Sequence, residues 1–109
     1  MTKGRRWSEI DRYGNEIYLT GERWEHITEP TNHPEMVLCE DELRQTIRLG
    51  QRKQDALNPQ KYKYMKAFDN LIEDNTHIVA VVLFRFIEND KSVALPNNYI
   101  VTAYQKEIG

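Results

Sequence analysis

The sequence predicts an α+β fold: an N-terminal hairpin, then two helices packed on one face of a four-stranded antiparallel sheet. The chain has 109 residues, which is too few for two separate cores, so a single domain over residues 1–109 is expected. Two helix-like segments come before four strand-like segments. Strands that follow one another closely usually pair antiparallel, so both helices must cover the same face of the sheet.

The first element expected is a β-hairpin near the N-terminus. Ile10 lies on one side of the Tyr13-Gly14-Asn15 segment, and Ile17 and Leu19 lie on the other side. A Gly-Asn step readily adopts the positive φ angles that tight hairpin turns require. These residues therefore predict two strands joined by a short turn.

A helix is expected to follow the hairpin directly. Thr20 is the predicted N-cap, and Glu22 lies in the first turn. Trp24 and Ile27 belong to this helix, which must end at or before Pro30 because proline cannot continue a helix. A short polar loop is expected next.

A second helix is expected to begin near Glu40 or Asp41, whose carboxylates suit the positive end of the helix dipole. Leu43 and Ile47 lie four residues apart, so they share one face of this helix. Gly50 is the predicted C-cap.

The rest of the chain is expected to form the sheet. The breaks between its strand-like segments are rich in Asn, Asp and Pro, which favour turns. The third segment is apolar on both alternations, which predicts a central strand covered at least partly on both faces. The predicted strands span residues 51–57, 61–68, 76–87 and 98–106.

Composition restricts the class of protein. Hydrophobic residues make up 39% and charged residues 29% of the chain, as in folded proteins. The longest apolar run, Ile78 to Phe84, is too short to span a bilayer, and no apolar segment of the signal-peptide kind lies at the N-terminus. Cys39 is the single cysteine, so an internal disulfide is excluded. A cytoplasmic protein without membrane contact is expected.

Basic residues are concentrated in one part of the chain. Between Leu43 and Lys66 the single acidic residue is Asp55, although the net charge of the chain is −2. One interpretation is a basic face on an acidic protein, and the other is an ordinary solvated surface of lysine and arginine. The basic residues are Arg44, Arg48, Arg52, Lys53, Lys61, Lys63 and Lys66.

Several stretches together carry a resemblance to a known family. They are Ile17-Tyr18-Leu19-Thr20, Glu22-Arg23-Trp24-Glu25-His26-Ile27, His33-Pro34-Glu35-Met36, Arg52, Lys61-Tyr62, the strand His77 to Leu83, and Val101-Thr102-Ala103-Tyr104. They resemble small bacterial and phage-associated domains of the barnase, EndoU, colicin and RelE-like ribonuclease superfamily. The resemblance implies two helices followed by a four-stranded antiparallel sheet. It also implies a toxin-type enzyme that cleaves RNA without a metal or another cofactor.

Cleavage of RNA through its own 2′-hydroxyl needs a base, an acid and groups that bind the phosphate. His26 is the leading candidate for the base or the acid, because it lies outside the apolar stripe of its helix. Arg52 has the planar guanidinium suited to the scissile phosphate. Thr102 and Tyr104 point to the same side of the last strand, where their hydroxyls could bind a phosphate oxygen or position the 2′-hydroxyl. An exposed histidine without a role, and ordinary β-forming residues, are the alternatives.

Candidate RNA contacts alternate along a strand. Tyrosines interleaved with lysines can stack bases while the cations bind phosphates, or they can form a core face backed by a solvated one. An arginine in the middle of an apolar strand is costly unless it is paired, bound to an anion or turned to the surface. The candidates are Arg23, Arg48, Lys53, Lys61, Tyr62, Lys63, Tyr64 and Arg85.

The remaining histidines and the cysteine suggest little further chemistry. His33 precedes a proline in a polar loop, where a structural role is the commoner outcome, and His77 is expected at the start of a strand as a packing or surface residue. The spacing of His26, His33 and Cys39 is not that of a zinc site, so no metal is expected. Acidic neighbours should raise the pKa of the Cys39 thiol, which predicts a poor nucleophile.

Three hypotheses for function remain open on the sequence. The first is a ribonuclease of a toxin or phage-defence system, whose partners would be RNA and a cognate antitoxin or immunity protein. It requires that His26, Arg52, Thr102 and Tyr104 converge on a concave basic face of the sheet. The second is a non-catalytic module on the same fold that binds RNA or a protein. The third is a plain interaction domain, for example a homodimer joined through a sheet edge or through Trp7.

Overall fold

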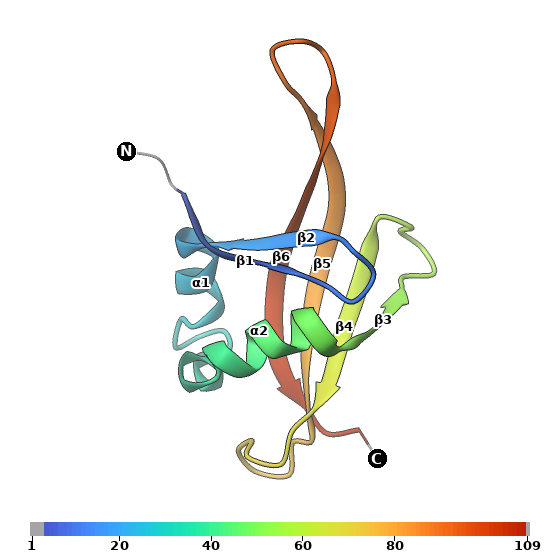
Figure 1. Cartoon of the computed structure of the whole chain (residues 1–109). Coiled ribbons are helices and arrows are strands. Elements are labelled where there is room, and N and C mark those ends of the chain that lie inside the picture. Colours follow the sequence, from blue (N-terminus) through green and yellow to red (C-terminus); the bar gives the residue numbers. More distant parts are fainter. Residues whose placement is uncertain (1–3, 109) are drawn as a thin grey trace.

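A computed structural model describes residues 4–108 of the chain. Within these residues, two α-helices, a short 3₁₀ helix and six strands make up an α+β fold (Figure 1). Their order is β1 (Arg5–Ile10), β2 (Glu16–Thr20), α1 (Gly21–Ile27), η1 (Pro34–Leu38), α2 (Glu40–Leu49), β3 (Gln51–Gln54), β4 (Lys61–Ala67), β5 (His77–Glu88) and β6 (Ala94–Lys106).

The sheet has six strands in the order β1-β2-β6-β5-β4-β3. The predicted antiparallel meander forms from β3 to β6, but the prediction of a four-stranded, wholly antiparallel sheet was wrong in detail. The N-terminal hairpin joins the sheet, because β2 pairs in parallel with the middle of β6 through Ile17–Asn98 and Tyr18–Tyr99. The Asn98 side chain also donates a hydrogen bond to the Glu16 carbonyl at 3.1 Å. This junction buries Ile17 and Leu19 completely, which the hairpin could not do alone.

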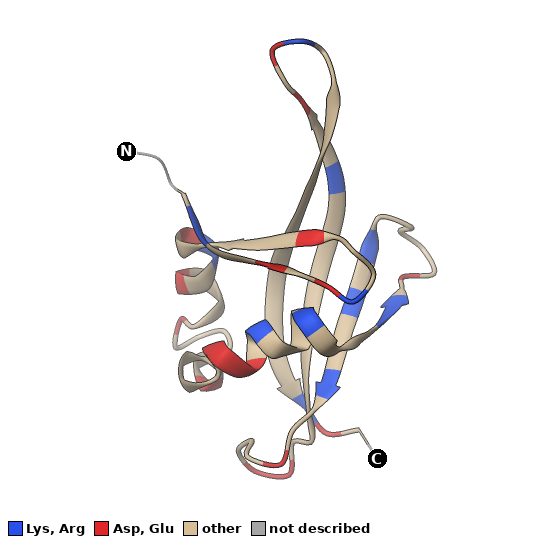
Figure 2. Cartoon of the chain, viewed as in Figure 1, with Lys and Arg blue, Asp and Glu red and all other residues tan. Residues whose placement is uncertain are grey.

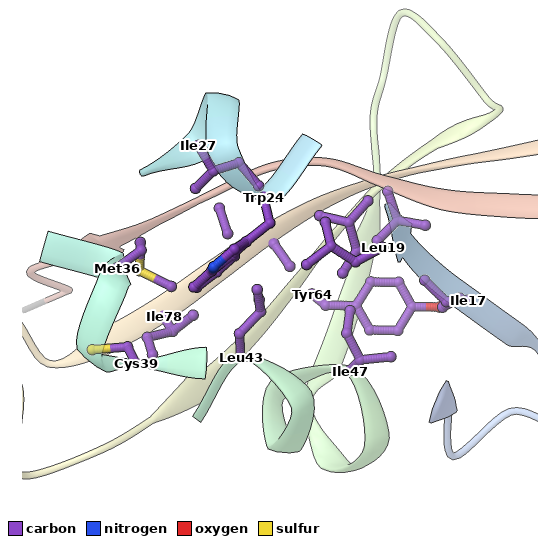
Figure 3. Packing of buried hydrophobic residues seen from close by; sticks show 14 of the residues in the cluster. Ile17, Leu19, Trp24, Ile27, Met36, Cys39, Leu43, Ile47, Tyr64 and Ile78 are labelled. Atoms are coloured by element: carbon purple, nitrogen blue, oxygen red, sulfur yellow. The ribbon is translucent and has the colours of Figure 1, made fainter. Parts of the chain in front are cut away.

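Both helices pack on one face of the sheet, and the hydrophobic core lies between them and the strands (Figure 3). Helix α1 contributes Trp24 and Ile27, and α2 contributes Leu43 and Ile47, as the spacing of these residues predicted. Tyr64 of β4 lies fully buried opposite the helices. No helix formed by residues 4–108 covers the other face of the sheet, which is called the helix-free face below.

The predicted helix signals are confirmed, and the turn signal is confirmed at Gly14 but not at Asn15, whose φ is not positive. Gly14 adopts a φ of 89° in the hairpin turn, and the Thr20 side chain accepts a hydrogen bond from the Arg23 amide at 3.0 Å as the N-cap of α1. Helix α1 ends at Ile27, and Gly50 is the C-cap of α2. One difference is η1, which forms where a polar loop was expected.

Gly50 is expected to tolerate no side chain. A Cβ atom there would lie 2.4 Å from the carbonyl oxygen of Thr46 and 2.7 Å from that of Met65, and neither backbone group can rotate away. We expect Gly50→Ala to lower the free energy of unfolding by about 1–3 kcal/mol, measured by urea denaturation. The matched control is Gly21→Ala, where a Cβ would meet no atom within 4 Å. Equal losses in the two variants would contradict this account of Gly50.

Strand β1 is fastened to α2 by a carboxylate that should make stability depend on pH. The Arg6 guanidinium and the Trp7 indole both donate hydrogen bonds to Glu40, the indole at 2.9 Å. The hydrogen bond from Arg6 lowers the pKa of Glu40 below its ordinary value of 4.5. The stabilisation is therefore complete above pH 4.5 and is lost as the pH falls through the lower pKa of the folded state.

We expect the wild type to be more stable than Glu40→Gln at neutral pH, and this difference to shrink as the pH falls well below 4.5. Urea denaturation of both proteins over this pH range measures the difference. A difference independent of pH would show that the charge of Glu40 does not contribute.

Candidate functional site

The register of the sheet decides which candidate residues can meet. Thr102 pairs with Val81, which in turn pairs with Lys63, and Tyr104 pairs with Val79. Directly paired residues point to the same face of a sheet and neighbours in sequence point to opposite faces. Since Ala103 belongs to the core under the helices, Thr102 and Tyr104 lie on the helix-free face.

Arg52 lies on the opposite face of the sheet from these hydroxyls. Its cross-strand partner is Tyr64, whose side chain belongs to the core on the helix side. The prediction that Arg52 converges with Thr102 and Tyr104 was therefore wrong. One strand position decides this outcome, because Lys53 next to it faces the other way.

Arg52 instead belongs to a polar cluster under the turn of the N-terminal hairpin. Its guanidinium lies 3.3 Å from the Tyr64 hydroxyl and 3.9 Å from the buried carboxylate of Asp11. It also packs over the rings of Tyr13 and Tyr62, at 4.2 and 4.5 Å from their centroids. The Tyr64 hydroxyl donates to Asp11, and burial together with this bond raises the pKa of Tyr64 well above its ordinary value. The cluster holds the hairpin on the sheet.

The tyrosine rings predicted to stack on RNA bases, those of Tyr62 and Tyr64, are consequently occupied by contacts within the protein. Tyr64 is fully buried, and Tyr62 packs against the core and under Arg52. Lys61 and Lys63 do lie on the other face. The alternative held open by the sequence, a core face backed by a solvated one, is the correct description of this strand.

The edge of β6 that faces away from β5 is paired with β2 over a short stretch, and the chain that follows α1 lies beside the rest of this edge. Strand β2 pairs with β6 only at Asn98 and Tyr99, and beyond them α1 and η1 contact β6 instead. In this region the His33 ring lies against the Tyr104 ring, with 5.5 Å between their centroids. The His33 Nδ1 atom lies 3.6 Å from a carboxylate oxygen of Glu35. A histidine, a carboxylate and a phenol thus meet at one place.

His26 lies on the exposed side of α1, as predicted. Its side chain is 54% exposed, and its Nδ1 atom is 3.6 Å from a carboxylate oxygen of Glu29. Arg23 lies one helical turn earlier and lines a pocket together with Tyr99 of β6. In the sequence, His26 lies between Arg23 and His33. Arg23 lies beside Tyr99 of β6, and His33 lies beside Tyr104 of the same strand.

The hydroxyl groups on this part of β6 are available for a ligand. Within residues 4–108, the hydroxyls of Thr102 and Tyr104 have no hydrogen-bond partner, and both side chains are half-buried. The guanidinium of Arg23 likewise has no hydrogen-bond or ion-pair partner within these residues. We use the name α1–β6 cluster for Arg23, His26, His33, Thr102 and Tyr104. Among the described residues, His33 contacts Tyr104 and Arg23 reaches β6 at Tyr99, whereas the ion-pair partner of the His26 side chain is Glu29.

Cations extend from this cluster across the helix-free face. Lys53 pairs with Lys63, and Lys61 pairs with Leu83, two positions before Arg85. All four cations therefore share one face, and Figure 2 shows basic residues in blue along β3, β4 and β5. One of them, Lys61, lies 3.9 Å from the carboxylate of Asp55. Four like charges so placed predict a positive potential over this part of the sheet.

Arg48 does not belong to this face. It extends from α2 and forms an ion pair with Glu9 of β1 at 3.4 Å, beside the ion pair of Arg44 with the same carboxylate. The carboxylate of Glu9, supplied by the hairpin, therefore occupies the guanidinium that the sequence offered as an RNA contact. His77 begins β5, where its ring nitrogen lies 2.7 Å from the Thr76 hydroxyl, in agreement with the expected strand-end position.

Other kinds of site find no support in the described part of the chain. Residues 4–108 hold no group of three or more His, Cys, Asp or Glu side chains placed to bind a metal. Cys39 is buried and receives a hydrogen bond from Gln105, and burial raises the pKa of its thiol, as expected for a poor nucleophile. None of the helices described is both long and apolar enough to cross a membrane.

The pairing of His33 with Tyr104 was not predicted, although the signal for it was present. The stretch His33-Pro34-Glu35 contributed to the resemblance, but a loop before a proline can point in many directions, so the sequence did not show which residue His33 contacts.

Comparisons with known proteins found no relative: no protein-family model, no curated protein and no solved structure matches the chain.

Proposed function

We propose that the chain is a metal-independent ribonuclease whose site is the α1–β6 cluster. The observation that carries the proposal is the contact of His33 with Tyr104, with Glu35 beside the imidazole. A histidine next to a carboxylate can accept and return a proton near neutral pH, and a phenol beside it can donate one. The resemblance of the sequence to toxin-type ribonucleases supports the same class of reaction.

The reaction requires no group beyond the RNA and these side chains. His33 takes the proton of a 2′-hydroxyl, and the 2′-oxygen attacks the adjacent phosphorus. The bond from phosphorus to the 5′-oxygen breaks, and this oxygen leaves with a proton from Tyr104, which His33 returns afterwards. The products are a 2′,3′-cyclic phosphate and a 5′-hydroxyl. The proton balance closes without water, metal or cofactor.

The phosphate would be bound by the other members of the cluster. Charge that develops on the phosphate oxygens is stabilised by donors already in place, here the guanidinium of Arg23 and the hydroxyl of Thr102. His26, on the same side of α1 as Arg23, adds a donor at the rim. Arg23 thus takes the part that the sequence assigned to Arg52.

The helix-free face would hold the RNA strand on either side of the scissile phosphate. Lys53, Lys63 and Arg85 lie on this face without an ion-pair partner among the described residues. Phosphate contacts by lysine and arginine supply most of the sequence-independent affinity for nucleic acid. A local basic face can act in this way although the whole chain carries a net charge of −2.

The second candidate is a non-catalytic RNA-binding module. It is favoured by the position of Arg52, since the arginine expected at the scissile phosphate lies on the other side of the sheet. This module would use the same cations and the same α1–β6 cluster, and only the proton transfers would be missing.

One experiment distinguishes the candidates. Purified protein is incubated in EDTA with a labelled RNA oligonucleotide and with DNA of the same sequence, and binding and fragment ends are measured for both. We expect cleavage of the RNA alone, with 2′,3′-cyclic phosphate ends, because DNA lacks the attacking hydroxyl. Binding of RNA without cleavage would support the module, and the absence of both would overturn both candidates.

A further inference from the structure

A pocket of about 200 Å³ lies at the junction where the hairpin joins the sheet. This is the place where β2 runs parallel to β6, and Figure 1 shows that α1 begins at the end of β2 nearby. The pocket is lined by Tyr18, Thr20, Arg23, Tyr99 and Ile100. Two aromatic rings and one guanidinium therefore surround a space on the side of the α1–β6 cluster.

The two rings differ in how firmly they are held. The Tyr18 hydroxyl donates a hydrogen bond to the Asn97 side chain at 2.9 Å, and the Arg5 guanidinium lies 4.1 Å from the centre of the Tyr18 ring. Tyr99 lies beside Tyr18, with 6.0 Å between centroids and the planes tilted by 41°. Within residues 4–108 the Tyr99 hydroxyl has no hydrogen-bond partner. The Tyr18 ring is thus held in place by its contacts, and the Tyr99 ring is the one available to a ligand.

The chemistry of the lining fits a planar ring that carries an anionic group nearby. An aromatic side chain binds any nucleobase through its π-face, and an unpaired guanidinium binds a phosphate. The pocket is smaller than the 300–1,000 Å³ range of drug-sized ligand sites, which leaves room for one ring system at a time. No carboxylate lines it to repel a phosphate.

We propose that this pocket binds one unpaired base of an RNA strand, stacked on Tyr99, with the phosphate of that nucleotide on Arg23. The inference rests on the proposed action on RNA and adds where the strand is held. Tyr99 lies three positions before Thr102 on β6, and Arg23 lies three positions before His26 on α1. In an RNA strand that follows the edge of β6, the phosphate of the stacked nucleotide on Arg23 is therefore the same phosphate on which the cluster acts. The pocket thereby selects single-stranded RNA, because a base inside a duplex cannot enter it.

The test compares Tyr99→Ala with Tyr99→Phe in binding to a short single-stranded RNA in EDTA, followed by fluorescence anisotropy. Loss of one stacked base is expected to weaken binding roughly 5- to 150-fold in Tyr99→Ala, while Tyr99→Phe keeps the affinity. Phe86→Ala, which removes an exposed ring from the distant end of β5, is the control and should bind like the wild type. Thermal unfolding checks that each variant is folded.

A second arm shows whether a base is what Tyr99 contacts. RNAs with a single abasic position are bound by wild type and Tyr99→Ala, and at one position the loss of the base should remove the effect of the substitution. If the wild type binds RNA but Tyr99→Ala binds equally well, or no abasic position abolishes its effect, the pocket inference is overturned and the proposed function stands. If the wild type neither binds nor cleaves RNA, the proposed function fails and the inference fails with it.

Discussion

Replacement of Asp11 by alanine is expected to lower the free energy of unfolding by about 3–5 kcal/mol. The Asp11 side chain is fully buried and accepts hydrogen bonds from the backbone amides of Tyr13 and Asn15, at 2.9 and 2.8 Å, and from the Tyr64 hydroxyl. Its removal leaves these donors without an acceptor and the guanidinium of Arg52 without its carboxylate. Urea denaturation measures the loss.

The control for Asp11 is Glu16→Ala on the same hairpin. Glu16 forms an ion pair with Arg5 at 3.4 Å, but the side chains are 54% and 47% exposed, so about 1 kcal/mol or less is expected. Tyr64→Phe should be intermediate, at about 1–3 kcal/mol, because it removes one of the donors to Asp11 and keeps the ring. If Asp11→Ala and Glu16→Ala cost the same, the cluster under the hairpin does not fasten it to the sheet.

The second large effect concerns the proposed cleavage of RNA. We expect His33→Ala to lower the rate of RNA cleavage about 10²- to 10⁴-fold, which is the usual contribution of a general base. The His33 ring contacts Tyr104, and Glu35 lies beside it, so its substitution removes the proton transfer at the place where the phosphate would lie. Single-turnover cleavage of a labelled RNA in EDTA measures the rate, and thermal unfolding checks the fold.

His26→Ala is the matched variant for His33→Ala. The His26 side chain is 54% exposed, whereas that of His33 is 34% exposed. His26 lies beside Glu29 of the neighbouring loop, whereas the His33 ring contacts Tyr104 of β6. A smaller loss of rate is therefore expected for His26→Ala. A larger loss for His26 than for His33 would assign the proton transfers to His26, as the sequence alone suggested, and would refute the role of the His33–Tyr104 pair.

Much of the fold could be predicted because its signals are local. Thr20 as N-cap, Gly14 in the hairpin turn and Gly50 after α2 each act within a few residues of chain, and all three occupy the predicted positions. The alternation along β4 is equally local, and the structure confirms its division into tyrosine and lysine faces. Which of these two faces is buried could not be predicted from neighbouring residues. It follows from which side of the sheet the helices cover.

The pairing of β2 with β6 was beyond the reach of sequence patterns. Its partners Tyr18 and Tyr99 lie far apart along the chain, and nothing near either residue marks the other. In the structure this parallel pairing holds the hairpin where Ile17 and Leu19 are fully buried. The pocket beside Tyr99 exists only as a result of this pairing.

For the candidate site, the sequence by itself determined the residue types, the strand faces of Thr102 and Tyr104, and the exposed side of α1 that carries His26. The tertiary structure decided which of these groups meet. It placed Arg52 with Asp11 under the hairpin, and it placed His33 against Tyr104. The physical reason is that alternation orients a side chain relative to its own strand, whereas its partners are set by the burial of apolar surface and the pairing of polar groups across the whole chain.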